Sequence, residues 1–299
     1  MSAYKAPLNE FIFLLKHLVN YDAHAELPGY EEVGMEMVEA ILPEAAKFFE
    51  NIIAPTNLET DQQGTRLNDG EVQIAPVIKG LGAQMSQAGW TGLGGSKDYD
   101  GSGFPGVVDL AVQEMLQSAN MSLSLLPLLT KGVIHALSLY GTDLQKQLFL
   151  THLTNGSWSG TMNLTEPQAG SDLSTIKCKA VPNDDHYLLT GQKIYITWGE
   201  HDQTENIIHL VLARLPDAPE GTQGISMFLV PKYLVNSDES LGRRNDVKVA
   251  GIERKLGIHG SPTCTMIYGD NGGAVGYLVG PENKGLMCMF SMMNNARLS

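Results

Sequence analysis

Apolar side chains in the first half of the chain recur at the three- and four-residue steps of a helix with one buried face. The clearest run covers residues 31–53. Its apolar positions are Val33, Met37, Ile41, Ala45, Phe48 and Ile52. Pro43 lies inside this run and is expected to kink or split the helix, because proline removes a backbone donor.

Three further segments, 74–88, 106–120 and 122–140, show the same helical period. The first has Pro76 in its opening turn and ends before Gly89. The second is expected to turn four apolar residues inward: Val108, Val112, Met115 and Ala119. The third is apolar nearly all round, which predicts a helix buried between others. A last helix, capped by Asp143 and ending at Gly156, completes an all-α first half.

The hydrophobic period changes to two after Gly156. Ile176, Cys178 and Ala180 alternate with polar neighbours, and β-rich runs follow at HYLLT, KIYIT, ENIIHLVLARL, GISMFLVP and TCTMIY. Loops such as PDAPEGTQG and GPENKG separate these runs. The spacing predicts an antiparallel barrel or sandwich of about 110 residues.

Helical character returns over residues 285–299, where Leu286, Met289, Phe290 and Met293 share one side. No capping residue ends this helix, so we expect the chain to stop inside a helix of a longer protein. The predicted organisation is a helical domain over 1–156, a β domain over 157–282, and over 283–299 the first helix of a domain that is otherwise absent.

Charge and cysteine content exclude several classes of partner. The 299 residues carry 20 Lys and Arg against 33 Asp and Glu, and the net charge of −13 would repel nucleic-acid phosphates. The three cysteines form no Cys-x-x-Cys pair, which fits a reducing cytoplasm. We find no signal peptide and expect no apolar run of the ~20 residues that cross a bilayer. A cytoplasmic protein with no nucleic-acid partner and no integral membrane contact is predicted.

The densest candidate chemistry is the segment NLTEPQAGSD, residues 163–172, where the α half meets the β half. Thr165 and Ser171 offer hydroxyls, and Gly170 lets backbone amides approach an anion or a ring edge. From these residues alone, a turn with satisfied polar groups is the simpler explanation. The segment QKIYITWG places Tyr195, Thr197 and Trp198 where they could hold a flat heterocycle. From the residues alone, core packing is the better explanation for Tyr195 and Trp198.

Together the two segments resemble the acyl-CoA dehydrogenase family, in which a TEP-x-x-GSD element precedes G-x-K-x-x-I-T. The phrases YGTDLQKQLFL, GIERKLGIHGSPT and GYLVGPENKGL follow the order of that family, and the resemblance covers almost the whole chain. The opening KAPLNEFIFLL and the loop KLGIHGSPT are similar to the long bacterial branch that includes methylmercaptopropionyl-CoA dehydrogenases.

The resemblance implies an α + β multidomain fold: an all-α N-terminal domain, a β-barrel middle domain and the start of a truncated C-terminal helical bundle. It also implies FAD, held between the last two domains. Thr165 would bond the pyrimidine side of the flavin, and the Thr197 hydroxyl would lie at N5. The family commonly has Trp where this chain has Tyr195, which reduces the stacking area. The implied cofactor residues are Met162, Leu164, Thr165, Gly170, Ser171, Tyr195, Ile196 and Thr197.

The reaction that the resemblance implies removes an α-proton and a β-hydride from an acyl-CoA, leaving trans-2-enoyl-CoA. Electrons would pass to an acceptor flavoprotein. A carboxylate must take the proton, and family members supply it from the C-terminal domain or from the last helix, where this chain has Ala296. No catalytic residue is therefore expected here, and the 299 residues alone are expected to be inactive.

Ser171, Asn294 and Arg297 are implied to contact the acyl-CoA. Glu166 is expected to brace the TEP turn and not to titrate, whereas Glu114 fits either the substrate cavity or a solvated helix face. The eight histidines show no metal-binding spacing, so no metal site is predicted. Two alternatives stay open: a non-catalytic acyl-CoA or partner-binding module of the same fold, and an acyl-CoA oxidase. A homodimer or homotetramer is expected of the full-length protein.

Overall fold

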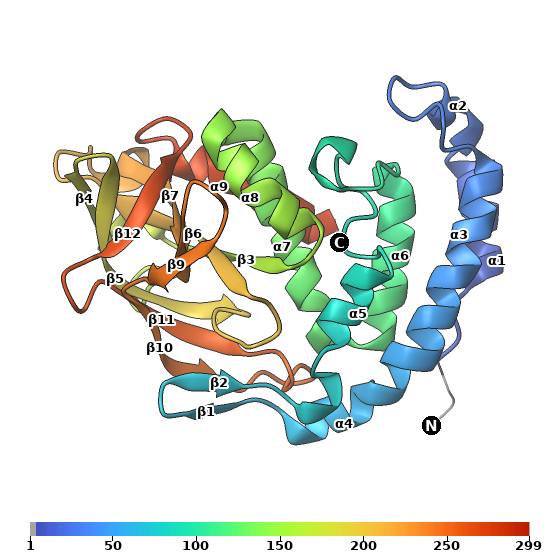
Figure 1. Ribbon diagram of the computed structural model, residues 1–299, viewed down its shortest axis with the longest axis horizontal. Coiled ribbons are helices and arrows are strands. Elements are labelled where there is room, and N and C mark those ends of the chain that lie inside the picture. Colours follow the sequence, from blue (N-terminus) through green and yellow to red (C-terminus); the bar gives the residue numbers. More distant parts are fainter. Residues whose placement is uncertain (1–3, 299) are drawn as a thin grey trace.

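A helical half precedes a β half in the computed structural model, which describes residues 4–298 (Figure 1). Ser299, the last residue of the predicted C-terminal helix, lies outside the described residues. The helical half also carries a small β1–β2 hairpin (Arg66–Asn68 and Glu71–Gln73). Its α-helices are α1 (Leu8–Phe13), α2 (Tyr21–Ala25), α3 (Met35–Phe48), α4 (Asn57–Gln63), α5 (Leu81–Gln87), α6 (Gly106–Ala119), α7 (Met121–Tyr140) and α8 (Asp143–Thr154).

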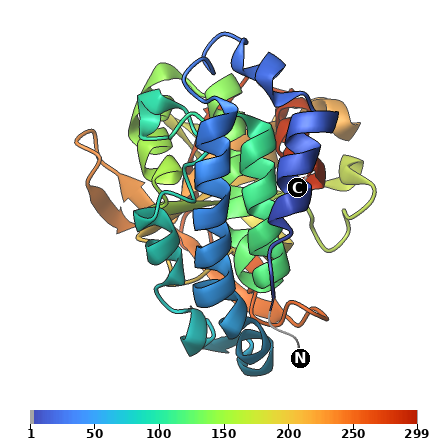
Figure 2. The same cartoon turned by 90° about the vertical axis from the view of Figure 1, so that its right-hand side faces the viewer.

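The buried face of α3 differs by one residue from the predicted face. Val38 and Leu42 are buried, whereas Met37 and Ile52 are exposed. The segment contains two overlapping apolar stripes, and packing against α6, which runs beside α3 in Figure 2, selects the second. Of the two effects predicted for Pro43, a kink or a split, the split is wrong, because α3 continues through this residue.

Backbone geometry corrects two other helix predictions. The segment 74–88 is not one helix, because Gly80 adopts a left-handed φ of +80° between a short 3₁₀ turn and α5. Thr142, not Asp143, caps α8: its side chain accepts from the Gln145 backbone while the Gln145 side chain accepts from the Thr142 backbone. The helices predicted at 106–120 and 122–140 are confirmed as α6 and α7.

By length and composition α7 could cross a membrane, so the expectation that no apolar run reaches that length is wrong. Half of its 18-residue apolar window, of mean hydropathy 1.4, is buried inside the protein. The helix packs against α6, α8 and the strand β3 (Trp158–Asn163). A core helix of a soluble domain passes the same test of length and hydropathy, and its packing accounts for its composition.

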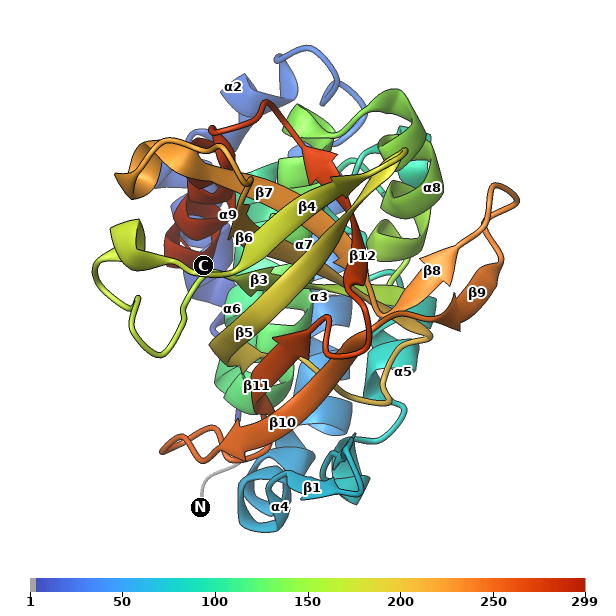
Figure 3. The same ribbon diagram turned by 90° about the vertical axis from the view of Figure 1, so that its left-hand side faces the viewer.

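The β half is a closed barrel flanked by α9 (Gly285–Leu298), as predicted for the fold and for the last helix (Figure 3). Around the barrel the strand order is β5, β12, β7, β6 and β4, and the ring closes where β4 pairs with β5. HYLLT and KIYIT form one strand, β5, and β3 pairs parallel to β6. The strands are β3 (Trp158–Asn163), β4 (Lys179–Asn183), β5 (His186–Thr197), β6 (Asn206–Arg214), β7 (Ile225–Pro231), β8 (Tyr233–Val235), β9 (Leu241–Arg244), β10 (Val247–Glu253), β11 (Thr263–Tyr268) and β12 (Ala274–Val279).

The two halves meet where α7 lies on β3. A Cβ added to Gly160 of β3 would lie 2.5 Å from the Val133 side chain of α7, so only glycine permits this close approach. The neighbouring residue of α7, Gly132, contacts the Met292 side chain of α9. Helix α7 therefore fixes the position of both the barrel and α9.

Gly160→Ala should destabilise the protein by about 1–3 kcal/mol, because the added methyl overlaps Val133 at a packed interface. Gly106→Ala is the control, since nothing lies within 4 Å of a Cβ at that position. Urea unfolding measures both. Equal unfolding free energies for the two variants would show that α7 and β3 are not tightly packed.

Candidate functional site

A groove of about 530 Å³ lies where the segment after β3, the end of β5 and the first turns of α9 come together. All the residues predicted to bind the cofactor line it: Met162, Leu164, Thr165, Gly170, Ser171, Tyr195, Ile196 and Thr197. The structure thus brings together two segments separated by more than twenty positions in the sequence. Whether they bind a cofactor stays a prediction.

A β-bulge at the end of β5 shapes one wall of the groove. Cys264 of β11 pairs with Ile196, but Met266 pairs with Lys193, so Ile194 and Tyr195 share one partner position. The bulge gives Tyr195 a left-handed φ of +61°. It also frees the Ile194 N–H to donate to the Thr165 carbonyl at 2.9 Å. One irregularity therefore joins the two groove-lining segments and turns Tyr195 out of the sheet.

A buried ion pair also joins the segment after β3 to the end of β5. Lys193 is fully buried, and its Nζ donates to Glu166 Oε1 at 2.8 Å and to the Leu164 carbonyl at 2.9 Å. The Glu166 carboxylate also accepts from the backbone N–H groups of Lys177 and Cys178, at 2.7 and 3.0 Å. The Lys193 bonds fix the TEP turn against β5, and the Lys177 and Cys178 bonds fix it against the segment that leads into β4.

The pKa of Glu166 reports the balance of these contacts. Burial by itself would raise the pKa, but the charge and hydrogen bond of Lys193, with the two backbone donors, lower it below the ordinary value. Glu166 is therefore ionised near neutrality and engaged by four different donors, including Gln168. The prediction that it braces the turn is confirmed by these bonds.

The chemistry of the groove fits a flat, polar heterocycle. Within residues 4–298, the hydroxyls of Thr165, Ser171 and Thr197 have no hydrogen-bond partner in the protein. Thr165 and Thr197 are half-buried, so that a ligand in the groove would gain their hydrogen bonds away from bulk water. Apolar side chains such as Leu129 and Leu164 supply a surface for a ring. The residues therefore suit the flavin that the family resemblance implies.

Sequence reasoning missed the α9 wall of the groove. Of the four residues predicted to share one side of this helix, Leu286, Phe290 and Met293 line the groove. The fourth, Met289, belongs to the buried side with Cys288 and Met292. Periodicity identifies an apolar stripe but not which neighbour it faces, so nothing in the sequence alone separates these two surfaces.

Other predicted residues lie outside the groove. Asn294 and Arg297 are exposed in the second half of α9, and Glu114 is exposed on α6. The carboxylate of the groove, among the described residues, is Asp172, which accepts from the Ser174 backbone at 2.9 Å. Hydrogen bonds from Ser174 lower the pKa of Asp172, which makes it a weak base.

Tyr195 and Trp198 have different environments, although core packing seemed to explain both. Trp198 is fully buried and its Nε1 donates to the Ser122 carbonyl at 3.1 Å. Tyr195 is 48% exposed, so the core interpretation is wrong for this residue. Its left-handed backbone places the ring at the rim of the groove.

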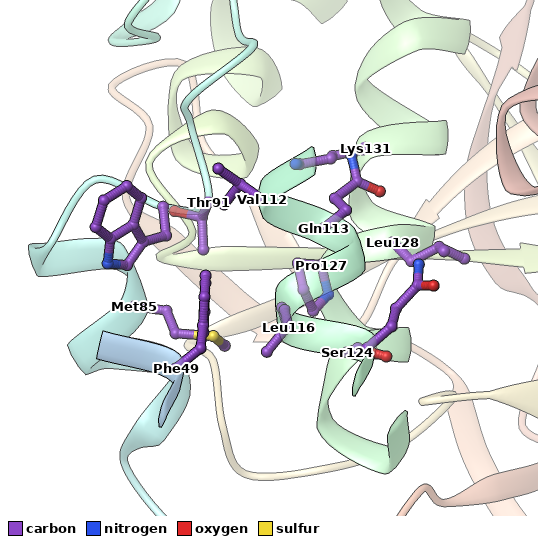
Figure 4. Close-up of a pocket in the computed structure, with 12 residues that line it drawn as sticks. Phe49, Met85, Thr91, Val112, Gln113, Leu116, Ser124, Pro127, Leu128 and Lys131 are labelled. Carbon is purple, nitrogen blue, oxygen red and sulfur yellow. The ribbon is translucent and has the colours of Figure 1, made fainter. Parts of the chain in front are cut away.

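A second hollow lies inside the helical half, between α6 and α7 (Figure 4). Phe49 and Met85 line one end, and Gln113 and Lys131 lie at the other. It offers about 20 Å³, room for about one water. The Lys131 ammonium is already paired with Asp109 at 2.6 Å. The hollow is therefore too small for a cofactor.

The fold is a helical domain followed by a closed β-barrel with a groove beside its last helix, and the sequence comparisons identify its family. Residues 35–157 match the acyl-CoA dehydrogenase N-terminal domain, and residues 161–271 match the acyl-CoA dehydrogenase middle domain. The chain belongs to the acyl-CoA dehydrogenase family.

Individual relatives agree with this assignment. The chain is 47% identical over 295 residues to 3-methylmercaptopropionyl-CoA dehydrogenase of Ruegeria pomeroyi, covering 98% of this chain and 50% of that protein. A butyryl-CoA dehydrogenase of Syntrophomonas wolfei is 34% identical over 99% of this chain and 50% of its own length. A Bacillus anthracis acyl-CoA dehydrogenase, solved with FAD, superposes with a TM-score of 0.70 at 24% identity, over 89% of this chain and 41% of that chain. The chain spans about half the length of the curated relatives it matches.

Lys193→Met should destabilise the fold by about 3–5 kcal/mol, because it leaves the Glu166 carboxylate buried without its counter-charge. Lys179→Met is a matched control, since Lys179 is exposed on the neighbouring strand β4. Chemical unfolding at pH 7 measures both variants. A loss of unfolding free energy below about 1 kcal/mol for Lys193→Met would show that the pair contributes no more than an exposed salt bridge.

The contribution of Glu166 should disappear in acid. Its pKa is lowered in the folded state, so its stabilisation is present above the unfolded value of about 4.3 and is lost as pH falls through the folded value. The gap in unfolding free energy between wild type and Glu166→Gln should therefore shrink between pH 5 and pH 3. A gap that stays constant over that range would contradict the ionised assignment.

Proposed function

We propose that the protein to which this chain belongs is an FAD-dependent dehydrogenase that converts an acyl-CoA thioester to trans-2-enoyl-CoA. The observation that carries the proposal is the groove, in which the two signature segments of the family meet with free hydroxyls and an apolar floor. The names of the relatives, a 3-methylmercaptopropionyl-CoA and a butyryl-CoA dehydrogenase, support the substrate class.

The residues of the groove would hold FAD. Thr165 and Thr197 offer hydroxyls on opposite segments, and Gly170 is open on its Cβ side, which leaves its backbone accessible to a polar group. Bound FAD supplies the hydride acceptor for the reaction. The protein binds and orients it: the Ile194–Thr165 bond and the Lys193 contacts set the separation of the two walls before any ligand arrives.

The substrate would enter beside α9, whose Phe290 and Met293 face the groove. We infer contacts to the acyl-CoA from Ser171 at the groove and from Asn294 and Arg297 further along α9. The proton acceptor is proposed to lie outside these 299 residues, because Asp172 is engaged by Ser174 and the last helix offers Ala296 where some family members carry a carboxylate. The 299 residues alone are then inactive.

Reoxidation and assembly follow from the same proposal. Electrons would leave through an acceptor flavoprotein, and the full-length protein would be a homodimer or homotetramer.

Anaerobic addition of an acyl-CoA to the FAD-loaded full-length protein tests the function: bleaching of the flavin absorbance supports dehydrogenation, and unchanged absorbance indicates a binding module. Fast reoxidation by oxygen would indicate an oxidase.

In the full-length protein, Thr197→Ala should slow flavin reduction about tenfold or more while weakening FAD binding less. A hydroxyl bond that strengthens as the flavin gains charge is worth about 1.5–3 kcal/mol in the transition state. Rapid-mixing reduction rates and FAD titrations separate the two effects. Thr190→Ala, on the same strand but outside the groove, is the control. A reduction rate equal to that of wild type for Thr197→Ala would refute the role.

A further inference from the structure

Tyr195 has an unusual position for an aromatic residue in a strand. It occupies the β-bulge, adopts a left-handed φ of +61° and leaves 48% of its surface exposed at the rim of the groove. A non-glycine residue in this conformation is strained, and such strain persists where the surroundings hold it. Something must therefore keep the ring at the rim.

The contact that covers the ring comes from Lys255, in the connection between β10 and β11. Its Nζ lies 4.5 Å from the centroid of the Tyr195 ring, within the range of a cation–π interaction. No carboxylate of the described residues lies within 4 Å of this ammonium. In a chain with 33 acidic and 20 basic residues, a lysine that faces an aromatic ring instead of a carboxylate has an unusual partner.

The connection that carries Lys255 is itself anchored on the helical half. The His259 backbone donates to Asp61 Oδ1 of α4 at 3.1 Å, and the His259 ring lies 3.1 Å from the same oxygen. At its far end, the Pro262 carbonyl accepts from the Trp198 backbone at 2.7 Å. Both bonds hold the connection on the C-terminal side of Lys255, and β10, which ends at Glu253 and pairs with β11, holds it on the N-terminal side.

We propose that Lys255 is a positioning residue that holds the Tyr195 ring as the outer wall of the flavin groove. The proposal rests on the proposed function for the identity of the ligand. Lys255 acts through Tyr195 and needs no contact with FAD.

A double-mutant cycle in the full-length protein tests the proposal. Lys255→Met should weaken FAD binding about two- to fivefold, the effect expected of an exposed cation–π contact. Lys255→Arg should restore the affinity, because a guanidinium also stacks on a ring. In a Tyr195→Leu background, Lys255→Met should have no further effect. Lys248→Met is the control, since Lys248 is paired with Asp270 in the turn that follows β11.

Two results would overturn the proposal. If Lys255→Met weakens FAD binding equally with and without the Tyr195 ring, the lysine acts directly on the ligand. If Lys255→Met behaves like Lys248→Met, the contact has no role in the groove.

A second readout needs no cofactor. In the FAD-free protein, Tyr195→Leu should raise the rate at which an acylating reagent modifies Lys255 relative to Lys248, as mass spectrometry can follow. An unchanged ratio would show that the ring does not engage the ammonium. This measurement tests the Lys255–Tyr195 contact even if the wild-type protein binds no FAD. A wild-type protein that binds no FAD would contradict the proposed function but not the contact.

Discussion

The buried ion pair between Lys193 and Glu166 is the constraint on which the groove depends. Burying two charges is costly, and the cost is offset only when every donor and acceptor is matched. Here the lysine reaches Glu166 and a backbone carbonyl, and the carboxylate collects two backbone N–H groups. The pair therefore specifies one conformation of the segment that follows β3, at a place where the backbone has little regular structure of its own.

The bulge in β5 depends on the same arrangement. Lys193 must point into the protein to reach Glu166, while Tyr195, two residues later, must reach the rim of the groove. A regular strand would place both side chains on the same face of the sheet. The extra residue in the bulge resolves this conflict, and its freed Ile194 N–H is used by Thr165. The buried ion pair, the strained backbone of Tyr195 and the shape of the groove thus depend on one another.

Much of this arrangement could be predicted, because local patterns encode it. The helices α6 and α7 and the long strands follow from periodicity, whereas the roles of the two groove-lining segments came from their resemblance to the acyl-CoA dehydrogenase family. The face of α3 and the partners of α9 could not, since overlapping apolar stripes are resolved only by contacts between distant elements. The positions of Gly80 and Thr142 show that backbone geometry and capping decide helix ends beyond what composition indicates. The bulge at Tyr195 has no sequence signal that distinguishes it from an ordinary strand residue.

The central claim is that the Lys193–Glu166 pair positions the groove and does more than stabilise the fold. FAD affinity measured for Lys193→Met and Gly101→Ala, at temperatures where both full-length variants are folded, tests this claim most directly. A Cβ added to Gly101 would lie 2.1 Å from the Gly95 backbone, so both substitutions reduce stability, but only the first removes a contact to the segment beside the groove. The account predicts that Lys193→Met loses about tenfold or more in affinity, equivalent to about 1.4 kcal/mol, while Gly101→Ala stays near wild type. Equal affinities for the two variants would contradict it.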